Sequence, residues 1–436
     1  MHLRLALRSP SPSASASASA SASGAPRRAG YLAVSLFGVG AVFASAPAAH
    51  AQGPAFQSPG MPSRPTLGQT TRFSNESNPA LGFVIDSVAD WRDGPGGDDG
   101  DDGFDFSVRL LEFNAAAYLD PNAWAYVVFV SEDLEAPEVE EAAIEFLGFG
   151  DRTSLKVGRF FVDFGKQMQQ HIEELRTVER PLVLRTLLGD ELGGAGAQVD
   201  WWTPLGDKTP LRASLGVFGS LISDEHGDEE GEAGPAAESP GLKDIDELSI
   251  TARITAMTEL TDNQTAQFGV SARIIPEFEF HDEEADVEAQ GLSNNVLGAD
   301  ITWGWVDAAT SREATVGIEW LMLTGDIAAE TDDVTDPLNP VIAVSDDDAS
   351  GFYAFADVGL NRRNNVGVQY SQVDLPENTA LEAREWDLYW THHFTEFRRL
   401  RLGVSHLDVD EAPGDDLRVY LQFTAYMGSH SHGWNW

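Results

Sequence analysis

The sequence predicts one all-β domain, a transmembrane antiparallel β-barrel of about 16 strands, within a range of about 14–18. Two observations predict it. From Pro79 onward, segments of about ten residues alternate between apolar and polar side chains, and the connections between them alternate between short and long. The chain after the export signal has no apolar run long enough for a spanning helix, so we expect any membrane span to be built from strands.

The N-terminal part of the chain reads as a leader and an export signal. Arg27 and Arg28 precede an apolar run, and a small-x-small cleavage site follows near Ala51. The run falls short of the ~18 residues that a membrane anchor needs, so we expect cleavage. The predicted divisions of the chain are a low-complexity leader and signal peptide (1–51), a flexible periplasmic segment (52–78), the barrel (79–428) and a His/Trp tail (429–436).

The predicted strands have one apolar and one polar face. In Leu248–Ala256 the even-numbered residues are apolar and the odd-numbered ones, including Arg253, are polar. Ala266–Ile274 repeats this pattern, and a change of parity at Leu110 and Leu111 predicts a β-bulge. A soluble β-sandwich would alternate equally well, but the apolar faces also carry the tryptophans expected of an interfacial girdle: Trp303, Trp305, Trp320, Trp386 and Trp390.

The connection lengths place both termini on the periplasmic side. Short turns face long outer loops, as in bacterial outer-membrane barrels, whereas a sandwich would not show this alternation. On this scheme the strands start near Leu81, Phe104, Trp124, Val139, Thr153, Gly194, Leu211, Leu248, Ala266, Val296, Ala314, Phe352, Val366, Glu385, Leu400 and Leu417.

The stretch Thr153–Ala197 contains the longest structured connection, which we predict to be the third outer loop folded into the lumen with a short helix ending at Pro181. We expect its basic side chains to face its acidic ones and so to narrow the bore, because charge arrays are how pores discriminate. The alternative is that these pairs tie the loop to the wall and fill a structural barrel. The predicted constriction consists of Lys166, Arg176, Arg180 and Arg185 with Asp163, Glu173, Glu174, Glu179, Asp190 and Glu191.

Metal binding is predicted at His430 and His432, which could share one Zn²⁺ on an extended tail. Two ligands fall short of a structural tetrahedral site, so a solvated tail is the alternative. His226 and His281 lie among acidic residues and could bind divalent cations weakly. No cofactor beyond such weak binding of zinc or another divalent cation is expected, and no set of residues predicts catalysis.

Composition excludes other classes of protein. The chain has 70 acidic against 28 basic residues, a formal charge of −42 and a pI near 4.3, which argues against nucleic-acid binding. It has no cysteine, so disulfide scaffolds and thiolate chemistry are excluded. The acidity fits either a cation-collecting mouth or an adaptation of the surface to salt.

Several stretches resemble a known family. They include NPALGFVIDSVADW, LKVGRFFVDFGKQMQQH, VERPLVLRTLLGDELGGAGAQVDW and the ending YLQFTAYMGSHSHGWNW. They are similar to porin-like outer-membrane β-barrels often labelled zinc-regulated TonB-dependent outer membrane receptors. The resemblance implies a barrel in the outer membrane of a Gram-negative type of cell. Such receptors carry a large N-terminal plug, whereas residues 52–78 alone precede the first predicted strand, so we expect a plug-less relative.

The functional expectation is a channel for passive or facilitated diffusion of small hydrophilic solutes, metal cations among them. Its expected partners are outer-membrane lipid, the barrel-assembly machinery, for which Trp436 is part of the signal, and a small polar solute or cation. The alternatives are a non-conducting surface barrel with acidic loops and a plug-less relative of a TonB-linked metal receptor.

Overall fold

The computed structural model describes residues 79–94, 103–147, 150, 152–206, 209–221, 244–282, 287–331, 341–345, 347–376, 378–412 and 414–428. The predicted signal peptide, the segment 52–78, the tail with His430 and His432, and His226 lie outside the described residues. These expectations therefore stay predictions.

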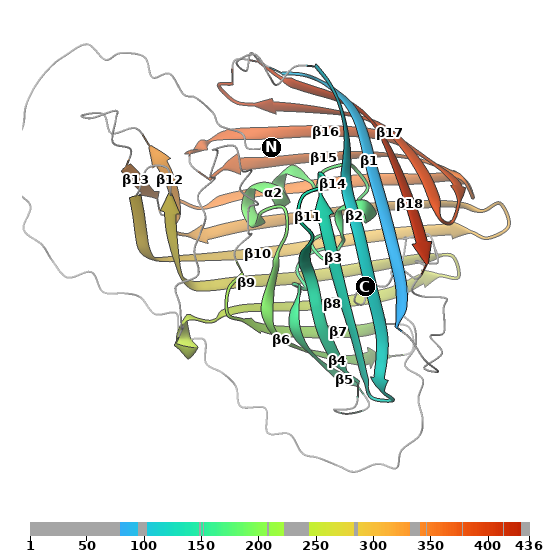
Figure 1. Cartoon of the computed structure of the whole chain (residues 1–436), viewed down its shortest axis with the longest axis horizontal. Coiled ribbons are helices and arrows are strands. Elements are labelled where there is room, and N and C mark those ends of the chain that lie inside the picture. Colours follow the sequence, from blue (N-terminus) through green and yellow to red (C-terminus); the bar gives the residue numbers. More distant parts are fainter. Residues whose placement is uncertain are drawn as a thin grey trace, which may run out of the picture. The chain divides into compact units, whose positions relative to one another are not determined.

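Sixteen of the described strands form one closed barrel, and each pairs antiparallel with its neighbours (Figure 1). β18 pairs with β1, from Gly82 opposite Gly428 to Asp93 opposite Leu417, and this pairing closes the sheet. The barrel strands are β1 (Ala80–Asp93), β2 (Gly103–Asp120), β3 (Ala123–Glu132), β4 (Glu138–Phe146), β5 (Thr153–Phe161), β6 (Gly193–Leu205), β7 (Thr209–Phe218), β8 (Ser249–Thr261), β9 (Gln264–Asp282), β10 (Val287–Asp307), β11 (Arg312–Gly325), β14 (Ala349–Asn361), β15 (Asn364–Leu375), β16 (Asn378–Thr395), β17 (Arg398–Val409) and β18 (Asp416–Gly428).

The predicted barrel and its strand number are confirmed, and most predicted starts fall within a few residues of the observed ones. Two starts are wrong: β10 begins at Val287 and β16 at Asn378, well before the predicted Val296 and Glu385. Each extension contains a register shift against a neighbouring strand, near Leu292 in β10 and between Asn378 and Glu382 in β16, and such irregularities interrupt the alternation that marks a strand. The hairpin of β12 (Ile327–Thr331) and β13 (Val341–Ser345) was not predicted either.

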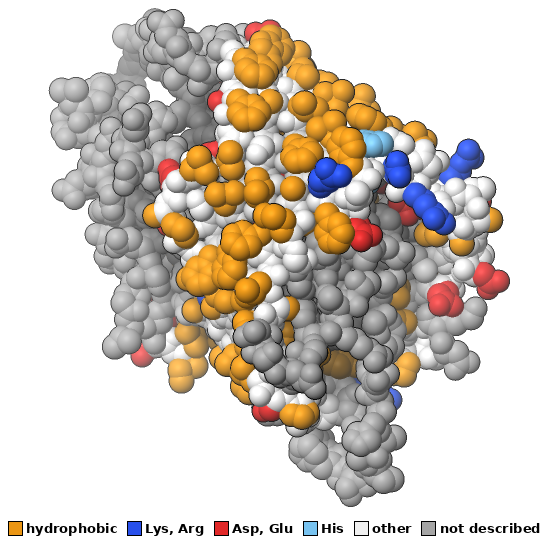
Figure 2. Space-filling view, turned by 45° about the vertical axis from the view of Figure 1, so that its right-hand side comes forward, with side chains coloured by type: hydrophobic (Ala, Val, Ile, Leu, Met, Phe, Trp, Pro, Cys, Tyr) orange, Lys and Arg blue, Asp and Glu red, His pale blue; other side chains and the backbone are white. Residues whose placement is uncertain are grey.

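The alternation of side chains is confirmed by burial. On β8, Ile254 points outward with half of its surface exposed, whereas the neighbouring Arg253 is buried inside the barrel. Figure 2 shows apolar side chains spread over the outer face, and Trp320 and Trp386 are among the exposed ones. Because apolar side chains point outward and polar ones inward, the barrel has the inverse pattern of a soluble domain.

The predicted bulge on β2 is also confirmed. Asp86 of β1 pairs with Leu110 but Val88 pairs with Ser107, so β2 has one extra residue between Ser107 and Leu110. Beyond the bulge, Glu112 is fully buried inside the barrel.

We call residues 162–192, which connect β5 to β6, the inner loop. It contains the short 3₁₀ helix η1 (Ile172–Glu174) and the helix α2 (Leu182–Leu188), and α2 lies against β14 and β15 (Figure 1). The expectation that Pro181 ends a helix is wrong. Pro181 is the N-cap of α2, because a proline costs no hydrogen bond at a helix start, and Gly189 ends α2 with a φ of 84°.

Residues Ile245–Glu247 form the 3₁₀ helix η2 before β8. Among the described residues, no helix has the length and apolar character needed to cross a membrane.

Candidate functional site

The inner loop is bound to strands around most of the barrel wall. Its residues form hydrogen bonds or ion pairs with side chains of β2, β4, β7, β8, β9, β11, β14, β15, β16, β17 and β18. A segment that contacts so many strands of a closed barrel must cross its bore. The inner loop and the wall residues that hold it are therefore the candidate functional site.

The loop begins with a buried ion-pair network around Asp163. One carboxylate oxygen of Asp163 lies 2.6 Å from Nη1 of Arg212 and accepts a hydrogen bond of 2.6 Å from Ser214, and the other lies 3.7 Å from Nε of Arg253. Burial alone would raise the pKa of Asp163, but the cations of Arg212 and Arg253 outweigh it and hold that pKa below its usual value. Asp163 is therefore a charged anchor between the loop and strands β7 and β8.

The next anchor is the backbone and side chain of Lys166. Its backbone N–H donates to Oε2 of Glu319 at 2.9 Å, and its Nζ donates to Oε1 of Gln267 at 2.6 Å. Gly165 precedes it at a φ of 58°, where a Cβ would lie 1.9 Å from Oε1 of Glu319. Any larger residue at position 165 would therefore strain the backbone and overlap the side chain of Glu319.

Burial and the surrounding charges shift the titration of Lys166. Burial lowers its pKa, the carboxylates of Asp300 and Glu319 raise it, and the cations of Arg253 and Arg176 lower it, to about 7. Lys166 is thus a group in the bore whose charge changes near neutral pH.

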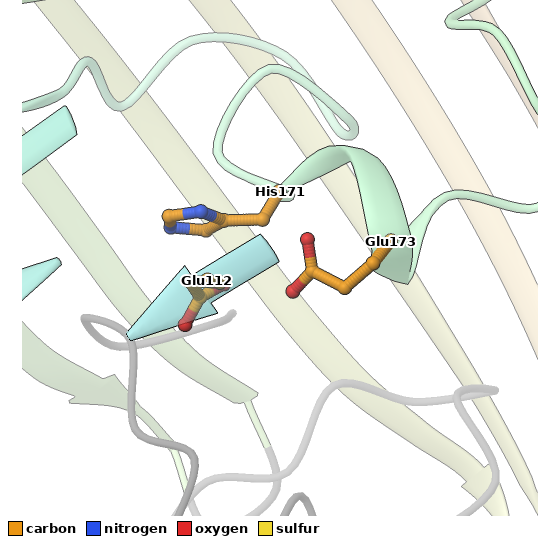
Figure 3. Close-up of side chains that lie close together, drawn as sticks. All are labelled: Glu112, His171 and Glu173. Carbon is orange, nitrogen blue, oxygen red and sulfur yellow. The ribbon is translucent and has the colours of Figure 1, made fainter. Parts of the chain in front are cut away.

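A group of carboxylates surrounds His171. Nδ1 of His171 lies 2.8 Å from Oε2 of Glu140, and Nε2 lies 3.2 Å from Oε2 of Glu141. Figure 3 shows the imidazole of His171 and the carboxylates of Glu112 and Glu173 converging on one small space. Burial alone would lower the pKa of His171, but Glu140, Glu141 and Glu173 raise it well above 6.5.

Two arginines of the loop reach acidic residues of the wall. Nε of Arg176 lies 2.7 Å from Oδ2 of Asp357, and its guanidinium stacks on the ring of Phe355, 3.8 Å from the ring centroid. Nη2 of Arg185 lies 2.7 Å from Oε1 of Glu385. These pairs fix the loop to β14 and β16.

Arginines of the wall in turn hold the loop backbone. Arg401 of β17 donates to the carbonyls of Leu175 at 2.6 Å and Thr177 at 3.1 Å. Arg109 of β2 donates to the carbonyl of Ile172 at 3.2 Å and also to that of Val178. Arg418 of β18 pairs instead with a loop side chain, the carboxylate of Glu179.

The predicted constriction residues thus lie on the inner loop, and they are paired both with one another, as for Glu179 and Arg185, and with the wall. Arg180 and Glu191 do face each other within the loop, at 3.7 Å. Asp163, Arg176, Glu179 and Arg185 form ion pairs with the wall, as the alternative expected, because inward positions of the strands carry complementary charges. Glu173 is buried beside His171, Glu174 is half-buried, and Asp190 is exposed.

The sequence did not indicate the wall residues that complete this site, among them Arg109, Arg401, Glu112, Glu140 and Glu141. Each looks like an ordinary polar position of an alternating strand. A charged residue in the middle of a strand's polar face could have indicated them, because a buried charge is costly unless it has a partner of opposite charge.

Comparison with known proteins supports the fold. The chain matches no protein-family model. An uncharacterized protein of Aquifex aeolicus (strain VF5) is 25% identical over 341 residues, which cover 75% of this chain and 69% of that protein.

Solved outer-membrane proteins share the architecture at low sequence identity. An anion-selective porin from Comamonas acidovorans superposes with a TM-score of 0.52 at 12% identity, covering 81% of this chain and 100% of that one. A loop-deletion mutant of OmpT, an outer membrane protein of Vibrio cholerae, gives a TM-score of 0.52 at 9% identity and covers 80% and 99%. OprB of Pseudomonas putida gives 0.51 at 9% identity and covers 80% and 94%.

These similarities give no support to the label of zinc-regulated or TonB-dependent receptor. They show that the chain has the closed sixteen-strand barrel fold of outer-membrane porins.

Proposed function

We propose that this protein is an outer-membrane, porin-like channel for the diffusion of small hydrophilic solutes, metal cations among them. The observation that carries the proposal is the inner loop, which crosses a closed barrel and is fixed to the wall by charged side chains. Barrels of about 16–18 strands enclose a lumen wide enough for an aqueous channel unless something fills it. The proposal involves no catalytic step.

Both signs of charge line the proposed constriction. Lys166 and Arg176 lie in it together with Asp163 and with wall acids such as Asp357 and Glu319. Charges of both signs across a narrow bore create a transverse field that favours small polar solutes over apolar ones. The class of solute that permeates, small hydrophilic molecules and metal cations, is itself part of the proposal.

The location in the outer membrane is supported by the belt of exposed apolar side chains on the outer face. In water, so large an apolar surface would be costly, whereas lipid tails cover it without cost. The proposal includes outer-membrane lipid and the barrel-assembly machinery as partners, with the signal peptide as the route of export.

A second candidate is a non-conducting barrel filled by the inner loop. It is favoured by the apolar side chains of the loop, since Leu175, Val183 and Leu184 are almost completely buried. Buried apolar side chains in a barrel interior resemble a packed core more than a water-filled channel. A TonB-linked metal receptor is a third candidate, and it requires an energy-coupled partner.

Single-channel recording separates these candidates. The folded protein, identified by its shift in gel mobility on heating, is added to a planar lipid bilayer in salt solution. We expect discrete conductance steps without any energy source. A folded protein that gives no steps at any voltage would remove the channel and favour the filled barrel or the energy-coupled receptor.

A further inference from the structure

We propose that Glu112, His171 and Glu173 bind one divalent transition-metal ion where the inner loop meets the wall. One atom of each residue that can ligate a metal lies within 4.8 Å of the corresponding atoms of the other two. Tetrahedral ligands at about 2.0–2.2 Å from one such ion lie about 3.3–3.6 Å apart, so closure requires the side chains to approach one another by at most about 1.5 Å. Figure 3 shows that the three side chains lie close together.

The site joins two parts of the molecule. Glu112 comes from β2 of the wall, whereas His171 and Glu173 come from the inner loop at η1. All three are buried, with exposed fractions of 0%, 1% and 0%. An ion held by these residues would fasten the loop to the wall, whether or not the barrel conducts.

The candidate ligands are oriented by further hydrogen bonds. Glu112 accepts a hydrogen bond of 2.7 Å from Nδ2 of Asn114. Glu141, which lies beside Nε2 of His171, accepts hydrogen bonds from the hydroxyl of Tyr126 at 3.1 Å and from the backbone N–H of Phe161 at 3.0 Å. Such outer contacts set the ring orientation of metal-binding histidines, whose second nitrogen usually donates to a carboxylate.

A β-bulge brings two successive carboxylates to the same histidine. Val128 of β3 pairs with Glu141, but Phe129 pairs with Val139, so Glu140 is the extra residue of β4. Successive residues of a regular strand face opposite sides, yet the side chains of Glu140 and Glu141 are both buried beside His171. Metal binding at one nitrogen of His171 would release a proton and replace one of these carboxylate partners, while the other nitrogen keeps its partner.

The mixture of ligands selects the class of metal. One imidazole with carboxylates suits ions such as Zn²⁺ or Mn²⁺, whereas Ca²⁺ and Mg²⁺ prefer oxygen ligands alone. This site differs in position and composition from the predicted pair His430 and His432, so the two can be tested separately.

The test is a metal titration of the full-length folded protein. The starting protein carries His430→Ala and His432→Ala and is stripped with a chelator; Zn²⁺ or Mn²⁺ is then added and bound metal is counted after equilibrium dialysis. We expect one equivalent per chain. Each of Glu112→Gln, His171→Asn and Glu173→Gln should weaken binding at least tenfold, whereas Glu174→Gln, on the same 3₁₀ helix, should change it less than twofold.

Absence of a saturable site, or a site that persists unchanged in all three ligand variants, would overturn the proposal. A second measurement needs no change to the ligands and so covers variants that fail to fold. In the His430→Ala and His432→Ala protein, pulsed electron paramagnetic resonance of bound Mn²⁺ should show coupling to one imidazole nitrogen. Coupling to none, or to two, would contradict the proposed ligand set.

Discussion

Two regions of the inner loop are held in the bore in different ways. Residues 163–171 are bound mainly through their own charged side chains, Asp163, Lys166 and His171, which reach partners on the wall. Residues 175–178 are bound largely through their backbone, because wall arginines such as Arg401 donate to their carbonyls, and the side chain of Arg176 adds one ion pair with the wall. The first kind of anchor depends on charged side chains of the loop, and the second depends on arginines of the wall.

This difference has an energetic consequence. Removing one member of a buried ion pair leaves the other charge without compensation, at a cost of about 3–5 kcal/mol. Removing a donor from a buried carbonyl costs about 1–3 kcal/mol. We therefore expect the first region to be more sensitive to single substitutions than the second.

The largest effect is expected for Asp163→Asn. It leaves the buried guanidinium groups of Arg212 and Arg253 without their shared carboxylate, so the free energy of unfolding should fall by about 3–5 kcal/mol. Denaturant unfolding in lipid vesicles measures it. Asp190→Asn, at an exposed position of the same loop, is the control and should change stability by less than about 0.5 kcal/mol.

A smaller effect is expected for Arg401→Met. The carbonyls of Leu175 and Thr177 lose their donor, and stability should fall by about 1–3 kcal/mol in the same unfolding assay. Arg384→Met is the control and should change stability less, because the ion pairs of Arg384 are exposed to solvent and so contribute little. An Arg401→Met loss larger than that of Asp163→Asn would contradict the proposed ranking of the two regions.

Gly165→Ala sharpens the comparison within the first region. Both Gly165 and Gly206 have positive φ, but a Cβ at Gly165 would overlap Glu319, whereas a Cβ at Gly206 would meet open space. Gly165→Ala should therefore cost about 1–2 kcal/mol more than Gly206→Ala. Equal losses in the two variants would mean that Glu319 does not confine the loop at this point.

The smallest effect is the response of ion selectivity to pH. Lys166, whose pKa is about 7, gains a proton as the pH falls from 8 to 6, so anions should permeate relatively better at the lower pH. One unit charge in the bore is worth about 1 kcal/mol to a passing ion, or about fivefold in relative permeability. Reversal potentials in a salt gradient measure it, and Lys166→Met should weaken the dependence.

The same titration has a predicted effect on folding. The pKa of Lys166 lies below its ordinary value of 10.5, so between about pH 7 and 10.5 the unfolded chain binds more protons than the folded one. The contribution of Lys166 to stability should then rise with pH across this window. A fall across it, relative to Lys166→Met, would contradict the assigned environment of Lys166.

The sequence predicted the barrel well because lipid-facing and lumen-facing side chains must alternate at every residue of a strand. Segments such as 248–256 and the bulge near Leu110 show that alternation directly. The extensions of β10 and β16 were not predicted, because register shifts interrupt the regular alternation there.

The site was predicted in part. The charged residues of the inner loop could be found because Lys166 and Arg176 stand out in an acidic chain. Their partners could not, because Asp357 and Glu319 belong to strands whose register with the loop depends on the closed barrel. The group around His171 joins residues from β2, β4 and the loop, and no local pattern of the sequence connects them.

The most direct test of the central claim, that the inner loop sets the bore, is the conductance of a variant from which Lys166–Leu188 is deleted. We expect the folded deletion variant to form a wider channel, with conductance steps larger than those of the unaltered protein and weaker selectivity between cations and anions. Conductance steps unchanged by the deletion would contradict the claim.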